Sequence, residues 1–261
     1  VQGSRKQEVA EVQAFLRWLR EGAFVFLGYR AYELVDVEGA RSVRLMDGSG
    51  LGVLRKEDES AYQTPVALGD LPSGVRTLAE EGPLLIISKT NAESTVHRGV
   101  RMDYIGVKRL DDEGRICGEH RFIGLFTSKA YTEPAQGIPI LREKLTHILD
   151  QAGVQAGSHD YKEINTIFNS MPKEELFLAS AEEIGVDVRT VLTSYLQEGV
   201  RVSLRQDPLQ RGVAVMVILP KDRFSGEVRR SIEQVLVDAY HGEVLNYHLA
   251  LGEGDQARLH F

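Results

Sequence analysis

Two apolar runs on either side of a polar turn form the clearest pattern in the chain. In MDYIGVKRL (102–110) and RICGEHRFIGLFT (115–127), β-branched and aromatic residues recur at short intervals. The residues DDEG (111–114) between them are types that form tight turns. The pattern predicts a β-hairpin, and the run LLIIS from Leu84 to Ser88 predicts a strand before it.

Apolar residues recur at helical spacing in several other segments. Glu8 to Arg20 predicts an amphipathic helix that ends at Gly22, and the next run, FVFLGYRAYEL from Phe24, predicts a strand that could pair with Val43 to Leu45. Ile140 to Leu149 predicts a second helix, ended by Gly153. Residues 47–83 are rich in glycine and proline, so we expect a long irregular connection there with one short helix at most.

The second half of the chain repeats one arrangement of elements. Ser180 followed by Glu183 is a capping box that predicts the start of a helix, which Gly199 ends. VRVSLR and VAVMVILP then flank a turn, a helix is predicted from Ser225 to about Tyr240, and EVLNYHLAL and ARLHF flank GEGD. The predicted order is α, β, β, α, β, β.

Strand pairs that alternate with single helices are typical of antiparallel sheets with helices on one face. We therefore expect an α+β protein of two ferredoxin-like, ACT-like open sandwiches joined by a helical segment. The expected domains are 1–153, with the irregular connection 47–83, then a helical linker 154–179, and a second ACT-like domain 180–261. We expect that second domain to be truncated, because its last strand-like run reaches Phe261 with no turn or cap after it.

Composition and charge narrow the class of protein. The chain has 261 residues, a formal net charge of -7 and one cysteine. An acidic chain with scattered Lys and Arg argues against nucleic acid as a partner, and no apolar run is long enough to span a membrane. Since Cys117 has no disulfide partner within the chain and no signal peptide precedes the first helix, we expect a cytoplasmic protein in which Cys117 is a half-buried structural residue.

Catalytic motifs are missing from the chain. Neither a phosphate-binding Walker loop nor an H-E-x-x-H zinc motif occurs, and the glycines at 48, 50 and 52 have the wrong spacing for a dinucleotide site. His241 and His248 lack a third ligand at a suitable spacing. We predict no catalytic, cofactor-binding or metal-binding residue in these 261 residues.

Two predicted strand-to-helix connections are candidates for an effector or an interface, because a helix N-terminus offers unpaired N–H groups to a carboxylate. A polar segment between strands is a third candidate. The residues are Thr127, Ser128 and Lys129 in the first connection, Lys221, Arg223 and Ser225 in the second, and Lys89, His97 and Arg98 in the polar segment. The alternative is that they are ordinary caps, surface charges and a solvated loop.

Several strings occur in an order that supports a family assignment. The chain contains FLGYR, TVHR, DYIGVK, RFIGLFTS and SHD, and later LPKDRFSGEVRRSIEQVL. In these strings and their spacing, nearly the whole chain resembles the N-terminal region of the large bacterial NAD-dependent glutamate dehydrogenases. The resemblance implies ACT-like regulatory domains that precede a dehydrogenase domain, whose glycine-rich lysine motif and Rossmann fold have no counterpart here.

The resemblance leads to one main hypothesis and two alternatives. The main one is a non-catalytic regulatory and oligomerisation segment whose parent converts L-glutamate and NAD to 2-oxoglutarate, ammonia and NADH. Its expected partners are the rest of the parent dehydrogenase, the parent's other subunits and a small amino-acid effector, and the chain is a candidate homo-oligomer. The alternatives are a free-standing ACT-like amino-acid sensor, and an enzyme in its own right, for which the residues supply no nucleophile, base or metal site.

Overall fold

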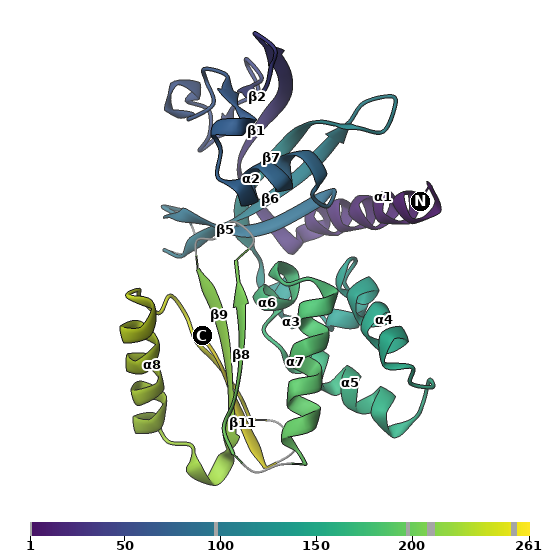
Figure 1. Ribbon diagram of the computed structural model, residues 1–261, viewed down its shortest axis with the longest axis vertical. Helices are drawn as coiled ribbons and strands as arrows, with labels where there is room; N and C mark the ends of the chain where they lie inside the picture. The colour runs from purple at the N-terminus through teal and green to yellow at the C-terminus, as the bar shows by residue number, and fades with distance from the viewer. Residues whose placement is uncertain (1, 97–98, 197–198, 208–211, 252–254) are drawn as a thin grey trace. The chain divides into compact units, whose positions relative to one another are not determined.

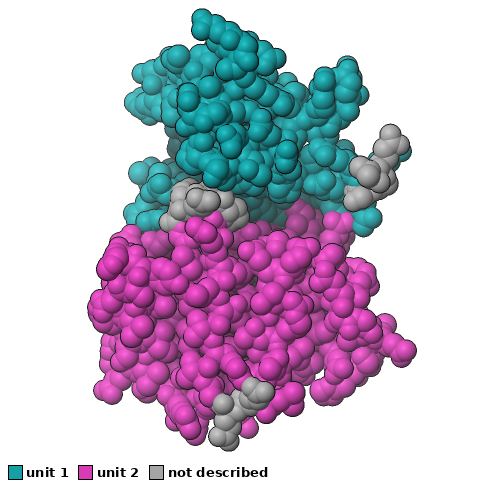
Figure 2. Space-filling model, in the orientation of Figure 1, with its two compact units in different colours: residues 1–133 teal, residues 134–261 magenta. Residues whose placement is uncertain are grey.

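The computed structural model describes the chain except for residues 1, 97–98, 197–198, 208–211 and 252–254. The chain folds into two compact units, Val1–Glu133 and Pro134–Phe261 (Figure 2). Each unit contains an antiparallel sheet with helices, so the predicted α+β class is confirmed. The domain boundaries predicted at residues 153 and 179 stay a prediction, and the helix predicted from Ile140, α4, lies in the second compact unit.

The sheet of unit 1 is antiparallel throughout and has the order β4-β2-β1-β7-β6-β5, with β3 paired to β1 (Figure 1). β1 is its longest strand and pairs with β2 and β7, as the sequence predicts for the segment from Phe24. The strands are β1 Phe24–Val37, β2 Ala40–Leu45, β3 Leu51–Gly52, β4 Val66–Ala67, β5 Leu85–Glu93, β6 Arg101–Leu110 and β7 Ile116–Phe126.

The predicted hairpin is confirmed as β6 and β7. Asp111 closes the turn, because its N–H donates to the Arg115 carbonyl at 2.9 Å and its carboxylate accepts from the N–H groups of Glu113 and Arg115. Gly114 has a φ of 80°, which suits glycine. On β7, a Cβ at Gly124 would lie 2.1 Å from the Val25 carbonyl oxygen of β1, so the close approach of these two strands requires glycine.

One boundary in unit 1 differs from the prediction. The strand predicted to end at Ser88 continues as β5 through Glu93, so Lys89 lies within a strand and not in a solvated loop. Lys89 pairs with Asp103 across the β5–β6 ladder, and their side chains form an ion pair at 2.7 Å. The Ser, Thr and Asn residues of this segment favour a turn by themselves. Cross-strand contacts such as this ion pair favour the paired strand.

The helices of unit 1 are α1 Gln2–Trp18, α2 Ser73–Glu81 and α3 Ser128–Thr132. α1 continues into a short π-type turn, Leu19–Ala23, which ends where Gly22 adopts a φ of 102°, as predicted. Phe15 and Trp18 of α1 are buried, and the Trp18 ring lies 6.3 Å from that of Phe126 on β7. This contact anchors the amphipathic face of α1 near the end of β7.

The glycine-rich stretch within residues 47–83 is a turn that binds its own chain. The N–H groups of Gly48 and Gly50 donate to the Glu57 carboxylate at 3.2 and 3.0 Å. These backbone bonds hold the pKa of Glu57 below its ordinary value. Within residues 47–83 the structure contains the short strands β3 and β4, two 3-10 turns and the helix α2.

Unit 2 begins with helices and continues with a four-stranded antiparallel sheet of order β10-β11-β9-β8. α8 follows β9, and the order α7, β8, β9, α8, β10, β11 is the predicted one. The helices are α4 Leu141–Ala152, α5 His159–Ser170, α6 Lys173–Leu178, α7 Ala181–Ser194 and α8 Gly226–Tyr240, and the strands are β8 Arg201–Gln206, β9 Val213–Pro220, β10 His248–Leu251 and β11 Gln256–His260.

Helices cover both faces of this second sheet (Figure 1). On one face, Val228, Ile232 and Leu236 of α8 pack against a cluster from β9 and β11 that includes Val217 and Leu259. Alternation along the strands turns Met216 and His260 to the opposite face, where α7 contacts β8 and β9. The sheet with α8 on one face forms an open sandwich, as predicted. The expectation that the helices share one face is wrong for α7, because Asp187 of α7 meets Ser203 and Arg205 on the opposite face of β8.

Candidate functional site: a buried polar network

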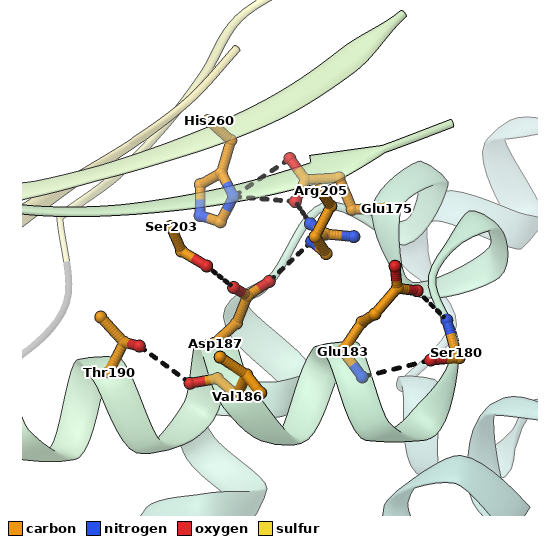
Figure 3. A network of polar contacts seen from close by, with 9 residues as sticks. All are labelled: Glu175, Ser180, Glu183, Val186, Asp187, Thr190, Ser203, Arg205 and His260. Atoms are coloured by element: carbon orange, nitrogen blue, oxygen red, sulfur yellow. Dashed lines mark hydrogen bonds and ion pairs between the residues drawn. The ribbon is translucent and has the colours of Figure 1, made fainter. Parts of the chain in front are cut away.

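α7 begins at the capping box that the sequence predicts. The Ser180 N–H donates to the Glu183 carboxylate at 2.7 Å, and the Glu183 N–H donates to the Ser180 hydroxyl at 3.2 Å (Figure 3). This reciprocal cap satisfies two N–H groups at the helix start and fixes where α7 begins. Asp187, one turn further along α7, faces the sheet, where its carboxylate meets Ser203 and Arg205 of β8.

A network of charged side chains joins α6 and α7 to the sheet (Figure 3). Asp187 is 1% exposed; it accepts a hydrogen bond from the Ser203 hydroxyl and lies 2.9 Å from Nε of Arg205. Arg205 also pairs with Glu175 of α6, whose carboxylate lies 3.0 Å from Nδ1 of His260 on β11. One guanidinium therefore bridges two carboxylates from different helices.

Burial and partners set the ionisation of the two carboxylates in opposite directions. Burial opposes the charged form of Glu175, but the hydrogen bond from His260 and the Arg205 charge outweigh it, so its pKa lies below the ordinary value. For Asp187, burial prevails over the Arg205 charge and the Ser203 hydrogen bond, and its pKa is raised. Both carboxylates are paired with Arg205 of the chain itself. We call this network a clamp, because its ion pairs hold α6 and α7 against the sheet.

A lysine on α4 binds the C-terminal end of α6. Nζ of Lys144 donates to the carbonyls of Leu176, Phe177 and Ala179 at the end of α6, at 2.8, 3.1 and 2.6 Å. These are the carbonyls that a helix leaves unpaired at its C-terminus, where a cation is favourable. Burial of the ammonium group lowers the pKa of Lys144 to about 8.

Unit 1 has a polar cluster of its own on β6, β7 and β1. Nζ of Lys108 lies 2.8 Å from the Glu119 carboxylate, which also accepts from the Tyr104 hydroxyl. The Arg121 guanidinium lies 4.2 Å from the ring centre of Tyr32 and 5.0 Å from that of Tyr104. Burial opposes ionisation of Glu119, but the Arg121 and Lys108 charges hold its pKa below the ordinary value.

A shallow groove of about 260 Å³ runs beside α7. It is lined by Val186, Arg189, Thr190, Thr193 and Arg201. The Thr190 hydroxyl donates to the Val186 carbonyl at 2.9 Å and the Thr193 hydroxyl to the Arg189 carbonyl at 2.8 Å, so both threonines are engaged with their own helix.

The first predicted connection closes the end of α1. The Thr127 hydroxyl donates to the Gly22 carbonyl at 2.7 Å, and Nζ of Lys129 donates to the Glu21 carbonyl at 3.1 Å. Ser128 begins α3, a helix of five residues, and its carbonyl accepts from Thr132. These contacts are those of ordinary caps, and a ligand-binding role for the three residues stays a prediction.

The second connection has the predicted N-cap. The Ser225 hydroxyl accepts from the Val228 N–H at 3.2 Å and caps α8. Lys221 and Arg223 bound the short 3-10 turn before it, where the Lys221 N–H donates to the Asp255 carbonyl at 2.8 Å. Of the third set, Lys89 is ion-paired on β5, whereas His97 and Arg98 lie outside the described residues.

Sequence reasoning missed the network residues Glu175, Asp187, Ser203, Arg205 and His260. The strand β8 did contain a signal, because Arg201, Ser203 and Arg205 alternate with Val202 and Leu204. Alternation alone does not say which face is buried, and in β8 the polar residues turn inward.

Among the described residues, no group of three His, Cys, Asp or Glu side chains could hold a metal ion. The helices described in the structure also lack the length and apolar character that a membrane span requires.

Two glutamate dehydrogenase families match consecutive parts of unit 2. Residues 138–198 match glutamate dehydrogenase, helical motif 1, and residues 201–261 match glutamate dehydrogenase, ACT2 domain. The first match covers α4 to α7 and the second covers β8 to β11 with α8. The network therefore crosses from one family region to the other, since Glu175 and Asp187 lie in the first and Arg205 and His260 in the second.

Curated relatives match nearly the whole chain. The NAD-specific glutamate dehydrogenase of Halomonas elongata is 31% identical over 96% of this chain and 15% of its own length. Those of Pseudomonas aeruginosa and Mycobacterium tuberculosis are each 30% identical over 98% of this chain, which spans 16% and 14% of their lengths. The predicted resemblance is confirmed, and the chain spans about one seventh of the relatives it matches.

Proposed function

We propose that this chain is a non-catalytic regulatory and oligomerisation segment of an NAD-specific glutamate dehydrogenase. The proposal is supported by the matches of residues 138–198 and 201–261 to glutamate dehydrogenase helical motif 1 and ACT2 domain, and by the curated NAD-specific relatives that match nearly the whole chain. The parent reaction would be the conversion of L-glutamate and NAD to 2-oxoglutarate, ammonia and NADH. In this proposal NAD binds in a dehydrogenase domain elsewhere in the parent, and these 261 residues need no cofactor. The remaining parts of the parent and its other subunits are the partners.

The observation that carries the proposal is the junction between the two family regions. Arg205 of the ACT2 region pairs with Glu175 and Asp187 of the helical motif, and side chains this buried move only if the whole clamp rearranges. A ligand or subunit that favours one position of the sheet would therefore bias the position of α6 and α7. Coupling of this kind between sites is typically worth about 1 to 3 kcal/mol.

Deletion within a longer parent polypeptide tests the proposal. We expect removal of the region equivalent to residues 1–261 to change the assembly state or the response to an effector. The purified 261-residue chain, assayed for glutamate-dependent NADH formation, should show no turnover. An unchanged assembly state together with an unchanged effector response would contradict the regulatory role, and turnover by the chain would contradict its non-catalytic character.

Calorimetric titration separates the regulatory segment from a free-standing amino-acid sensor. The chain is titrated with free amino acids, 2-oxoglutarate and NAD, and the Lys129→Gln and Lys221→Gln variants are titrated in parallel. Saturable binding of one amino acid that a variant abolishes would favour a ligand-reading module. Absence of binding would favour a role in subunit assembly.

A further inference from the structure

The face of β8 that does not meet α7 is apolar and uncovered. Val202 and Leu204 are 54% and 55% exposed, whereas Ser203 and Arg205 between and beside them turn inward to the buried network. The register places Val202 beside Val217 and Leu204 beside Val215, both of which belong to the core cluster under α8. Val202 and Leu204 therefore lie on the same face of the sheet as the core cluster, but α8 covers β9 and β11 and leaves β8 exposed.

α8 forms one wall of this uncovered area. The Arg229 guanidinium of α8 lies 4.6 Å from the ring centre of Tyr247, on the side of β10. Arg229 and Val235 lie on either side of the core-facing residues Ile232 and Leu236 around the helix. Val235 therefore lies on the flank toward β8, and it is 64% exposed. Val213, at the start of β9, is also exposed. We call Val202, Leu204, Val213 and Val235 the β8 strip.

The dimensions of the β8 strip suit a helix. Neighbouring strands lie about 4.8 Å apart and packed helices lie about 8 to 10 Å apart, so one helix covers about two strands. α8 covers β9 and β11, so the next position for a helix beside it lies over β8. Edge addition of a second copy through β8 is less favourable, because antiparallel pairing centred on Ser203 would set Arg201 of each copy opposite Arg205 of the other.

Charge on the flank of α8 specifies the occupant further. At about 100° per residue, Glu227 and Asp238 lie within about 80° of Val235 around α8. Arg229 and Arg230, the basic residues of that helix, lie about 120° or more from Val235. We propose that the β8 strip binds an amphipathic helix from outside residues 1–261, whose apolar face covers Val202 and Leu204 and whose basic flank faces Glu227 and Asp238. The proposal does not depend on the regulatory role.

A peptide-binding measurement tests this surface. The probe is a fluorescein-labelled 18-residue peptide of leucine and lysine, with leucine at helical spacing, and its anisotropy is measured against the purified chain in 0.15 M salt. We expect saturable binding, at least tenfold weaker for Val202→Glu/Leu204→Glu. A version of the peptide with glutamate in place of lysine should also bind at least threefold more weakly, because the flank of α8 is acidic.

Matched controls make the outcome decisive. Val186→Glu/Leu245→Glu adds the same charge at exposed apolar positions, 48% and 59% exposed, outside the strip, and should bind as the wild type does. Hydrogen exchange of the wild-type chain gives a readout that needs no variant, since residues 201–206 should become protected when the peptide is added. Absence of saturable binding, equal loss in the control variant, or a wild-type dimer that the strip variant converts to a monomer would each overturn the proposal.

Discussion

At the scale of single residues, several charges of unit 2 are buried beside a partner, and Arg205 and Lys144 are the clearest cases. Arg205 holds two carboxylates, and Lys144 holds three carbonyls at the end of α6. A buried ion pair adds little by itself, but removal of one partner leaves the other charge buried without compensation. The consequences of substitution should therefore be large and specific.

Arg205→Met should lower the free energy of unfolding by about 3 to 5 kcal/mol, because Glu175 and Asp187 then lose their shared cation. Arg230→Met on the exposed side of α8 is the matched control and should change stability by less than about 0.5 kcal/mol. Urea unfolding followed by circular dichroism measures both. A loss below about 1 kcal/mol for Arg205→Met would show that the network is not a clamp.

The lowered pKa of Lys144 predicts that the free energy of unfolding depends on pH in the alkaline range. Its pKa is about 8 in the folded chain and near the ordinary value of about 10.4 in the unfolded chain. Between these values the unfolded chain binds more protons, so the free energy of unfolding rises with pH. From about pH 8 to about pH 9.5 we expect the wild type to gain about 1 to 2 kcal/mol relative to Lys144→Met. Parallel pH curves for the two proteins would contradict this.

At the scale of elements, local signals decided where several helices and turns begin or end, although α7 ends at Ser194 and not at the predicted Gly199. The capping box of α7, the left-handed Gly153 after α4 and the Asp111 turn of the hairpin are all formed as the sequence predicts, because each depends on atoms within a few residues. β5 was underestimated at its polar end, where pairing with β6 overrides the turn preference of its residues.

Ser180→Ala should cost about 1 kcal/mol, since it removes the hydroxyl that caps α7. Ser128→Ala, at a helix start without a side-chain cap, should be within about 0.5 kcal/mol of the wild type. Thermal unfolding at neutral pH compares the two. Equal effects of both substitutions would mean that the cap does not stabilise α7.

At the scale of the whole molecule, the chain is two compact units with separate sheets. The core of unit 2 is assembled from its own elements, as the packing of α8 on β9 and β11 shows. The resemblance that the sequence strings indicate extends over both units, whereas the two glutamate dehydrogenase family matches lie in unit 2.

Residues 134–261 expressed alone should unfold in a single cooperative transition, because the cluster of α8, β9 and β11 and the ion pairs of Arg205 join elements within that unit. Differential scanning calorimetry checks this by comparing calorimetric and van't Hoff enthalpies. A broad, non-cooperative transition would show that unit 2 requires residues outside 134–261 for its packing.

The sequence by itself determined the α+β class, the hairpin, the helix caps and the family resemblance, because these depend on residue order and short-range chemistry. The network of Glu175, Asp187, Arg205 and His260 was decided by tertiary structure, since its members are up to 85 residues apart and meet only when α6 and α7 pack on the sheet. The orientation of β8 was decided in the same way. Its period of two fixes which residues share a face, but only packing against α7 buries the charged face and leaves Val202 and Leu204 exposed.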